Sequence, residues 1–239
     1  PLFGAMLMIG TFAIFFSMIW QYSFSTPGMM LETPELKSLI LGFREENPIL
    51  PCLFVTIACG ILSGFHATQS PIVARTMKSE REARGTFYGM MIVEGVIAMI
   101  WAAAGFAIYN LIPTKFAENS TQVLVDITQY FLGGWMGVLT IIAVVILAIT
   151  SGDTAMRSLR LSLAEILNIG QTKLVNRVLL CLPLVVLVAG LLWWSNMSAE
   201  SFKHLWNYFA WGNQVLGACT LTATSVWLFS QKKNGWVTL

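Results

Sequence analysis

The sequence predicts an all-α integral membrane protein with about six transmembrane helices. Of its 239 residues, 56% are hydrophobic and only 11% are charged, whereas a soluble domain usually carries about 25% charged residues. The mean hydropathy is +0.70. The 14 basic and 12 acidic side chains cannot cover a soluble surface of this size, so we expect most of the surface to face a lipid bilayer.

Six stretches are long and apolar enough to cross the hydrocarbon core of a membrane, which takes about 20 residues of helix. They are, approximately, Leu2–Tyr22, Ile49–His66, Phe87–Tyr109, Gly134–Ile149, Val178–Trp194 and Leu205–Phe229. The second and the fourth are short and run into small, polar segments, so we expect these two helices to end in broken or unwound segments. Residues 1–239 are predicted to form a single transmembrane region.

The basic residues predict how the spans are oriented. Ten of the 14 Lys and Arg residues follow the second, fourth and sixth spans, namely Arg75, Lys78, Arg81, Arg84, Arg157, Arg160, Lys173, Arg177, Lys232 and Lys233. Because short cytoplasmic loops are enriched in Lys and Arg, this alternation predicts that both ends of the chain lie in the cytoplasm.

Several classes of function are disfavoured by the same composition. The net charge is only +2, and no basic face with interleaved aromatic residues indicates a nucleic-acid partner. The four cysteines lie in apolar runs without the spacing of metal ligands. No HExxH, GxSxG or P-loop sequence is present, so we predict neither an enzyme nor a bound cofactor or metal.

Polar residues within or beside the spans are the candidate functional residues, because a charged side chain at the bilayer centre costs about 2.5–3.5 kcal/mol. The first group ends the second span and comprises Ser63, Gly64, His66, Thr68, Gln69 and Ser70, followed by Pro71. If this segment is unwound, its polar groups could hold a substrate carboxylate, a proton or a cation. The alternative is an ordinary helix end.

Glu94 is the second candidate. It stands about 9 residues into its span, which places it about 14 Å deep at about 1.5 Å per residue. One interpretation is a hydrogen-bonded side chain that holds helices together, and the other is a proton carrier.

The third candidate is the segment Thr150–Arg157, which contains Asp153 and Thr154. Asp153 and the neighbouring hydroxyls could bind a cation or a proton, or Asp153 could cap an amphipathic helix that begins at Thr154. Asn213 and Gln214 interrupt the last span and could close the site from a third direction.

Four of these segments, taken together, resemble a known family. Residues 57–71 read IACGILSGFHATQSP, residues 88–95 YGMMIVEG, residues 150–157 TSGDTAMR and residues 211–216 WGNQVL. They are similar, in the same order, to motifs of the carbon starvation protein A family of bacterial inner-membrane transporters. Longer members carry Ser-Ser-Gly-Thr where this chain has Thr68–Pro71, which suggests the shorter branch of the family.

The resemblance implies uptake of small peptides, or in some members pyruvate, when preferred carbon is scarce. It also implies a fold related to the amino acid–polyamine–organocation transporters, with broken helices around a central site. The chain starts at Pro1 within an apolar run, and the family's N-terminal half is missing, so we expect a fragment whose partner is that half.

We therefore expect a secondary active transporter in the bacterial plasma (inner) membrane that carries small peptides or pyruvate-like monocarboxylates. A proton or sodium ion would be co-transported. The alternative is a non-transporting membrane sensor or scaffold, for which the polar residues within the spans would be dispensable.

Overall fold

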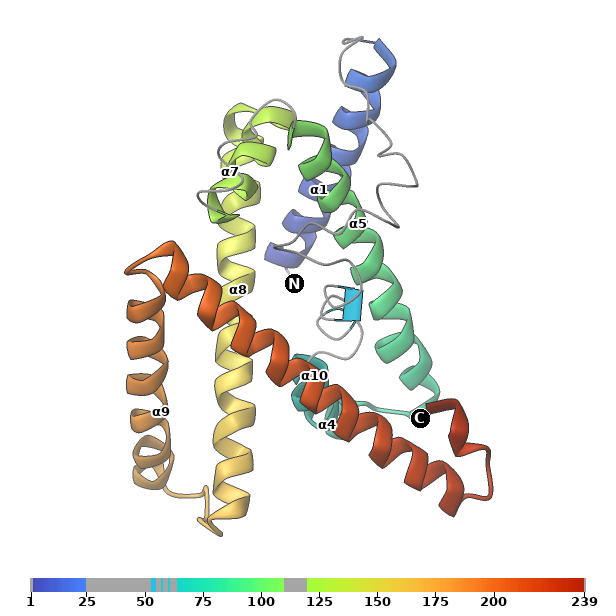
Figure 1. The fold of residues 1–239 in the computed structure, drawn as a ribbon, viewed down its shortest axis with the longest axis vertical. Helices are drawn as coiled ribbons and strands as arrows, with labels where there is room; N and C mark the ends of the chain where they lie inside the picture. Colours follow the sequence, from blue (N-terminus) through green and yellow to red (C-terminus); the bar gives the residue numbers. More distant parts are fainter. Residues whose placement is uncertain are drawn as a thin grey trace. The chain divides into compact units, whose positions relative to one another are not determined.

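A computed structural model describes residues 2–24, 64–109 and 120–238, together with positions 53, 54, 57 and 60. The described segments are helical (Figure 1). The α-helices are α1 (Leu2–Phe24), α4 (Gly64–Thr76), α5 (Met90–Tyr109), α7 (Ser120–Phe131), α8 (Gly134–Ile166), α9 (Leu174–Ser195) and α10 (Ala199–Ser230). Two short 3-10 helices, η1 (Glu80–Glu82) and η3 (Gly235–Thr238), and a π-helix, η2 (Arg84–Gly89), complete them. The predicted all-α class is confirmed.

Four helical segments of the described part are long and apolar enough to cross a membrane: Leu2–Gln21, Glu80–Ile108, Gly134–Ile166 and Leu174–Ser195. They correspond to the first, third, fourth and fifth predicted spans. The sixth predicted span is helical within α10 but is not among the four. Most of the second predicted span lies outside the described residues. An integral membrane protein is thus confirmed, and the number six stays a prediction.

The break predicted at Thr150–Arg157 is wrong. Helix α8 continues without interruption from Gly134 to Ile166. Thr150 Oγ1 donates a hydrogen bond to the carbonyl of Leu147 at 2.9 Å, so this hydroxyl finds a partner on its own helix and does not require an unwound backbone.

The segment Gly64–Pro71 is also helical rather than unwound, since all of it lies within α4. Pro71 has no N–H and leaves the carbonyl of Ala67 without its helical donor. Ser70 Oγ donates a hydrogen bond to the neighbouring carbonyl, that of His66, at 2.6 Å. This bond lies one residue before the carbonyl that Pro71 affects, so it does not replace the missing backbone donor.

The chain divides into two compact units. The first consists of Pro1–Pro34 and Arg84–Asp153, and the second of Glu35–Ala83 and Thr154–Leu239. In the first unit, α1, α5 and α7 pack against one another. The hydrophobic core of this unit is formed by the buried residues Ile14, Ile100, Ala104, Ile108, Ile127 and Phe131.

Two hydrogen bonds join the helices of the first unit. The indole Nε1 of Trp101 on α5 donates to Thr11 Oγ1 on α1 at 3.1 Å, and Thr11 is fully buried. Ser17 Oγ on α1 donates to the carbonyl of Phe131, the last residue of α7, at 2.7 Å. These bonds satisfy polar groups inside an apolar core, where an unpaired group is costly.

Small residues allow close approach in the first unit. A Cβ on Gly10 would meet Thr140 Oγ1 and lie 2.8 Å from Thr140 Cγ2, and a Cβ on Gly137 would lie 3.1 Å from the carbonyl oxygen of Thr128. Gly133 has a φ of +59° between α7 and α8, which a glycine adopts without a steric penalty. Glycines thus join α7 to α8 and bring α8 against α1.

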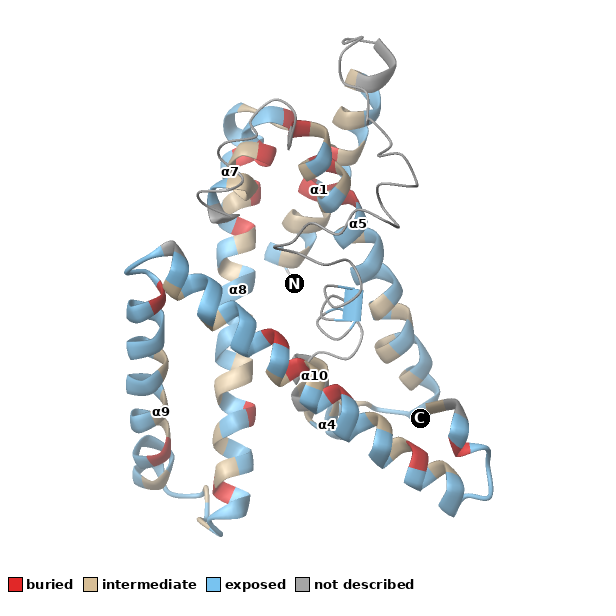
Figure 2. Ribbon diagram, in the orientation of Figure 1, coloured by how far each residue is buried: buried red, intermediate tan, exposed pale blue. Residues whose placement is uncertain are grey.

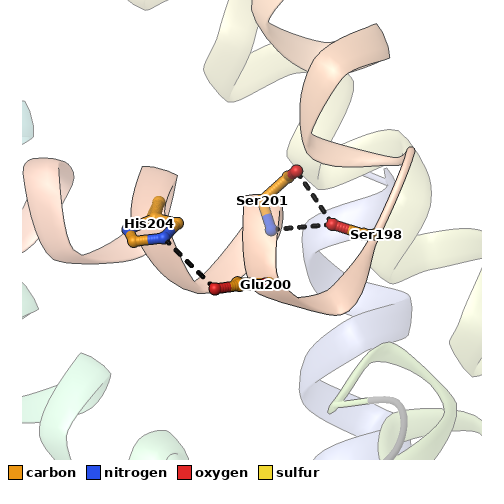
Figure 3. Close-up of polar contacts among 4 residues, drawn as sticks. All are labelled: Ser198, Glu200, Ser201 and His204. Carbon is orange, nitrogen blue, oxygen red and sulfur yellow. Dashed lines mark hydrogen bonds and ion pairs between the residues drawn. The ribbon is translucent and has the colours of Figure 1, made fainter.

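The second unit contains α4, α9, α10 and η3. Ser198 caps α10, because its Oγ accepts a hydrogen bond from the backbone N–H of Ser201 at 3.1 Å (Figure 3). His204 Nε2 lies 3.8 Å from Glu200 Oε1 on the same helix, and both side chains are exposed. At the other end of α10, Ser225 Oγ and Thr238 Oγ1 are 2.7 Å apart, which holds η3 against the helix.

Large apolar side chains cover the outer surface of the described helices. On α9, Leu179 is 68% exposed and Trp193 74% exposed, and Figure 2 shows that most of this helix is accessible. Apolar helices with accessible surfaces of this kind are suited to a lipid environment.

The contact between α1 and α8 generates a stability prediction. Gly10→Ala should lower the free energy of unfolding by about 1–3 kcal/mol, because the added methyl group overpacks against Thr140. The measurement is thermal or denaturant unfolding in detergent micelles, followed by circular dichroism. Gly4→Ala on the same helix is the matched control, because a Cβ there meets nothing within 4 Å.

The double variant Gly10→Ala/Thr140→Ala should recover most of the loss, since it removes the methyl and hydroxyl groups that the new Cβ would meet. Equal stability of Gly10→Ala and Gly4→Ala would contradict this account of the helix contact.

Candidate functional site

The first predicted group of site residues lies at the start of α4. Gly64, His66, Thr68, Gln69 and Ser70 are on this helix, whereas Ser63 lies outside the described residues. The side chains of His66, Gln69 and Ser70 are half-buried. All of these residues lie on α4 because nothing in the sequence ends this helix before Thr76.

Gln69 has an unusual hydrogen-bonding environment. Its Nε2 is buried and has no hydrogen-bond partner in the structure as described. A buried donor without a partner costs about 1–3 kcal/mol, so native structures rarely keep one without a reason. The amide is therefore available to donate to an acceptor that comes from outside these helices.

Helix α10 contributes the second part of the site. Ala210, Asn213 and Gly217 are buried and recur at intervals of three and four residues, so they share one face of the helix. Asn213 is only 4% exposed, and Gln214 is half-buried.

Helix α4 packs against α10. Among the other described elements of the second unit, α9 joins α10 through the turn before Ala199, and η3 lies near Ser225 at the far end.

The electrostatic character of this region is neutral. Neither the stretch 64–74 of α4 nor the stretch 210–217 of α10 contains Asp, Glu, Lys or Arg. Its polar groups are amides, hydroxyl groups and the imidazole of His66. Such a site can bind a polar ligand by hydrogen bonds, and a buried neutral donor favours an acceptor-rich or anionic group.

Glu94 belongs to the first unit, on α5, where its side chain is exposed. It stands five residues beyond η2, the π-helix that leads directly into α5. This π-helix was not predicted from the sequence. Its glycines, Gly85 and Gly89, were the only local signal, and π-helical turns occur frequently at functional sites.

Thr150, Asp153 and Thr154 lie inside α8 rather than at its end. The interpretation of Asp153 as an N-cap is therefore wrong, because an N-cap residue precedes the helix and has non-helical backbone angles. The Asp153 side chain is exposed and that of Thr154 is half-buried. Thr150 and Asp153 belong to the first unit, and Thr154 to the second.

Helices α4 and α10, which carry these two groups of residues, pack against each other within the second unit. Two further atoms were not predicted from the sequence. Arg160 Nε and Gln171 Oε1 are buried and have no hydrogen-bond partner in the described part of the protein, and both belong to the second unit. No pattern in the sequence marks such atoms, since burial at a single atom depends on tertiary packing. The described residues contain no cluster of three or more His, Cys, Asp or Glu side chains that could hold a metal ion.

Comparison with known proteins identifies the family. The family model described as "Carbon starvation protein CstA" matches residues 5–130 and 112–239. The chain belongs to this family. The predicted resemblance is therefore confirmed, with matches over nearly the whole chain. No solved structure matches it.

Three relatives are similar to parts of this chain. An uncharacterized membrane protein of Haemophilus influenzae is 40% identical over 120 residues, which cover 46% of this chain and 32% of the relative. The peptide transporter CstA of Helicobacter pylori is 39% identical over 97 residues, covering 39% of this chain and 14% of the relative. The pyruvate/proton symporter BtsT of Escherichia coli is 34% identical over 110 residues, covering 43% of this chain and 15% of the relative. The matched part of this chain thus spans at most about a third of these three relatives.

Proposed function

We propose that this chain forms part of a secondary active transporter of the bacterial inner membrane that takes up small peptides or pyruvate-like monocarboxylates during carbon starvation. Family membership, the four apolar helices of the described part and the names of the relatives support transport in general. The choice of substrate and of a proton or sodium gradient is the finer part of the proposal.

The single observation that carries the proposal is the buried, unpaired amide donor of Gln69 on a helix that packs against α10. Small peptides and pyruvate share one chemical group, a carboxylate. A carboxylate accepts hydrogen bonds strongly, particularly where water is excluded. In the proposal, Gln69 Nε2 donates to the substrate carboxylate, and this bond removes the cost of the unpaired donor.

The remaining predicted residues have supporting roles in this proposal. Ser63, Gly64, His66, Thr68 and Ser70 would line the α4 side of the substrate site. The amides of Asn213 and Gln214 would line the α10 side. Glu94 would carry the coupling proton. The Asp153 carboxylate would accept a proton, or would bind a sodium ion together with the hydroxyl oxygens of Thr150 and Thr154.

Other parts of the whole protein complete the site in this proposal. The sequence match covers only 14% and 15% of the two named transporters, and many apolar side chains of the described helices are exposed. We infer that the family's N-terminal half covers part of this surface, that lipid covers the rest, and that both ends of this segment face the cytoplasm.

Substitution of Gln69 tests the proposed site. In proteoliposomes that contain the full-length protein, uptake of labelled pyruvate and of a labelled dipeptide is measured under an imposed pH or sodium gradient. Gln69→Leu keeps the size but removes the donor, so KM for a transported carboxylate should rise roughly 10- to 100-fold, as expected for a lost hydrogen bond to a charged group.

Gln129→Leu is the matched control, because Gln129 is exposed on α7 in the other unit. It should transport like the parent protein. Parent-like KM values in Gln69→Leu would remove Gln69 from the site. Failure of the parent protein to take up either substrate would instead contradict the proposed function.

Glu94 tests the coupling. Glu94→Gln keeps the shape and the hydrogen-bonding capacity of the side chain but cannot release a proton. Accumulation driven by a pH gradient should be lost, while exchange of labelled for unlabelled substrate across the membrane should continue. If Glu94→Gln accumulates substrate as the parent does, Glu94 has a structural role and the coupling residue is another one.

A further inference from the structure

The start of α10 is strongly amphipathic. Phe202, Leu205, Trp206 and Phe209 recur at intervals of three and four residues and fall on one face of the helix. The opposite face carries Glu200, Lys203, His204 and Asn207, all of them exposed. This segment, residues 199–209, is hereafter the aromatic segment.

Three rings form a continuous ladder on the apolar face. The ring centroids of Phe202 and Trp206 are 6.2 Å apart in a stacked arrangement, and those of Trp206 and Phe209 are 5.6 Å apart. The ladder is nevertheless accessible, since the three residues are 43%, 55% and 52% exposed. The described part of the protein therefore leaves a large aromatic surface uncovered.

The position of the aromatic segment follows from α9. Helix α9 is apolar enough to cross a membrane, and it ends at Ser195 directly after Trp193 and Trp194. Tryptophan is enriched at the boundary between lipid and water. Only a short turn separates this end from Ala199, so the aromatic segment begins where α9 leaves the bilayer.

The course of α10 agrees with this position. Figure 1 shows α10 leaving the end of α9 obliquely rather than returning alongside it. Helices with aromatic and Leu residues on one face and polar or basic residues on the other typically lie in the membrane surface.

We propose that the aromatic segment binds the interface of the bilayer, with its ring ladder inserted at the boundary of headgroups and acyl chains. The partner is the phospholipid bilayer itself. Continuity with the membrane end of α9 and the placement of polar and charged groups on the opposite face both favour lipid over a protein partner. The membrane-embedded part of α10 then begins only beyond this segment, near its buried Ala210 and Asn213.

Spin-label depth measurements on the full-length protein in phosphatidylcholine–phosphatidylglycerol vesicles test this proposal. Single labels are placed at Phe202, Trp206 and Phe209, and at Glu200, His204 and Asn207. Accessibility to oxygen and to a water-soluble nickel complex gives the depth of each label. The labels at Phe202, Trp206 and Phe209 should all lie at one depth. The labels at Glu200, His204 and Asn207 should be accessible to the nickel complex. Accessibility along the segment should therefore oscillate with the helical period of about 3.6 residues.

Labels at Leu179 and Val186 on α9 provide the matched control. They are also seven residues apart, and both are exposed. On a spanning helix, seven residues correspond to a depth change of about 10 Å. A comparable steady change from Phe202 to Phe209 would overturn the proposal, because it would show that the segment crosses the bilayer.

Low accessibility of the ladder labels to both reagents would also overturn it, because a protein surface would then cover the rings. Since labels at ring positions can disturb packing, an unlabelled measurement accompanies them. Quenching by lipids brominated near the headgroups should fall in Trp206→Phe relative to the parent protein. Interfacial placement would be contradicted by the opposite result in Trp206→Phe. Quenching by lipids brominated near the headgroups would then be unchanged, and quenching by lipids brominated near the bilayer centre would be reduced.

Discussion

The bilayer imposes one constraint on which the remaining structure depends: polar groups inside it must find partners within the protein. Most polar groups of the described helices meet it locally. Ser70 and Thr150 donate to carbonyls of their own helices, and Trp101 donates to Thr11 across the core of the first unit. Gln69 Nε2 departs from this rule because it is buried without a partner in the described residues. It shares this property with Arg160 Nε and Gln171 Oε1 among the described residues, and it is the one of the three that lies among the polar residues of α4.

The features that depend on apolar composition were predicted well from the sequence. It predicted the all-α class and the helices α1, α5 and α9, because a run of about 20 apolar residues has few alternatives to a membrane helix. It was a poor guide to helix ends. Breaks were expected over Gly64–Pro71 and Thr150–Arg157, but the first segment lies within α4 and the second within α8. The residue types show where a helix is weakened, but not whether it ends there.

For the candidate site, sequence patterns supplied residue types but not their grouping. The amides of α4 and α10 belong to one compact unit, and Glu94 and Asp153 to the other. No periodicity could have predicted this division, or which buried side-chain atoms lack a hydrogen-bond partner. Helix α10 illustrates the same limit: its length suggested one span, whereas the ring ladder at its start and the buried amide at Asn213 distinguish two parts with different surroundings.

The central claim, that a buried neutral donor recognises a carboxylate, is tested most directly by equilibrium binding. Labelled pyruvate and a labelled dipeptide are bound to the purified full-length protein and displaced either by the unlabelled acids or by their uncharged amides, pyruvamide and the C-terminally amidated dipeptide. The account predicts that each unlabelled acid displaces the labelled ligand far more effectively than the corresponding amide does. In Gln69→Leu, acid and amide should differ less in how effectively they displace the ligand. Equal displacement by acids and amides in the parent protein would contradict it.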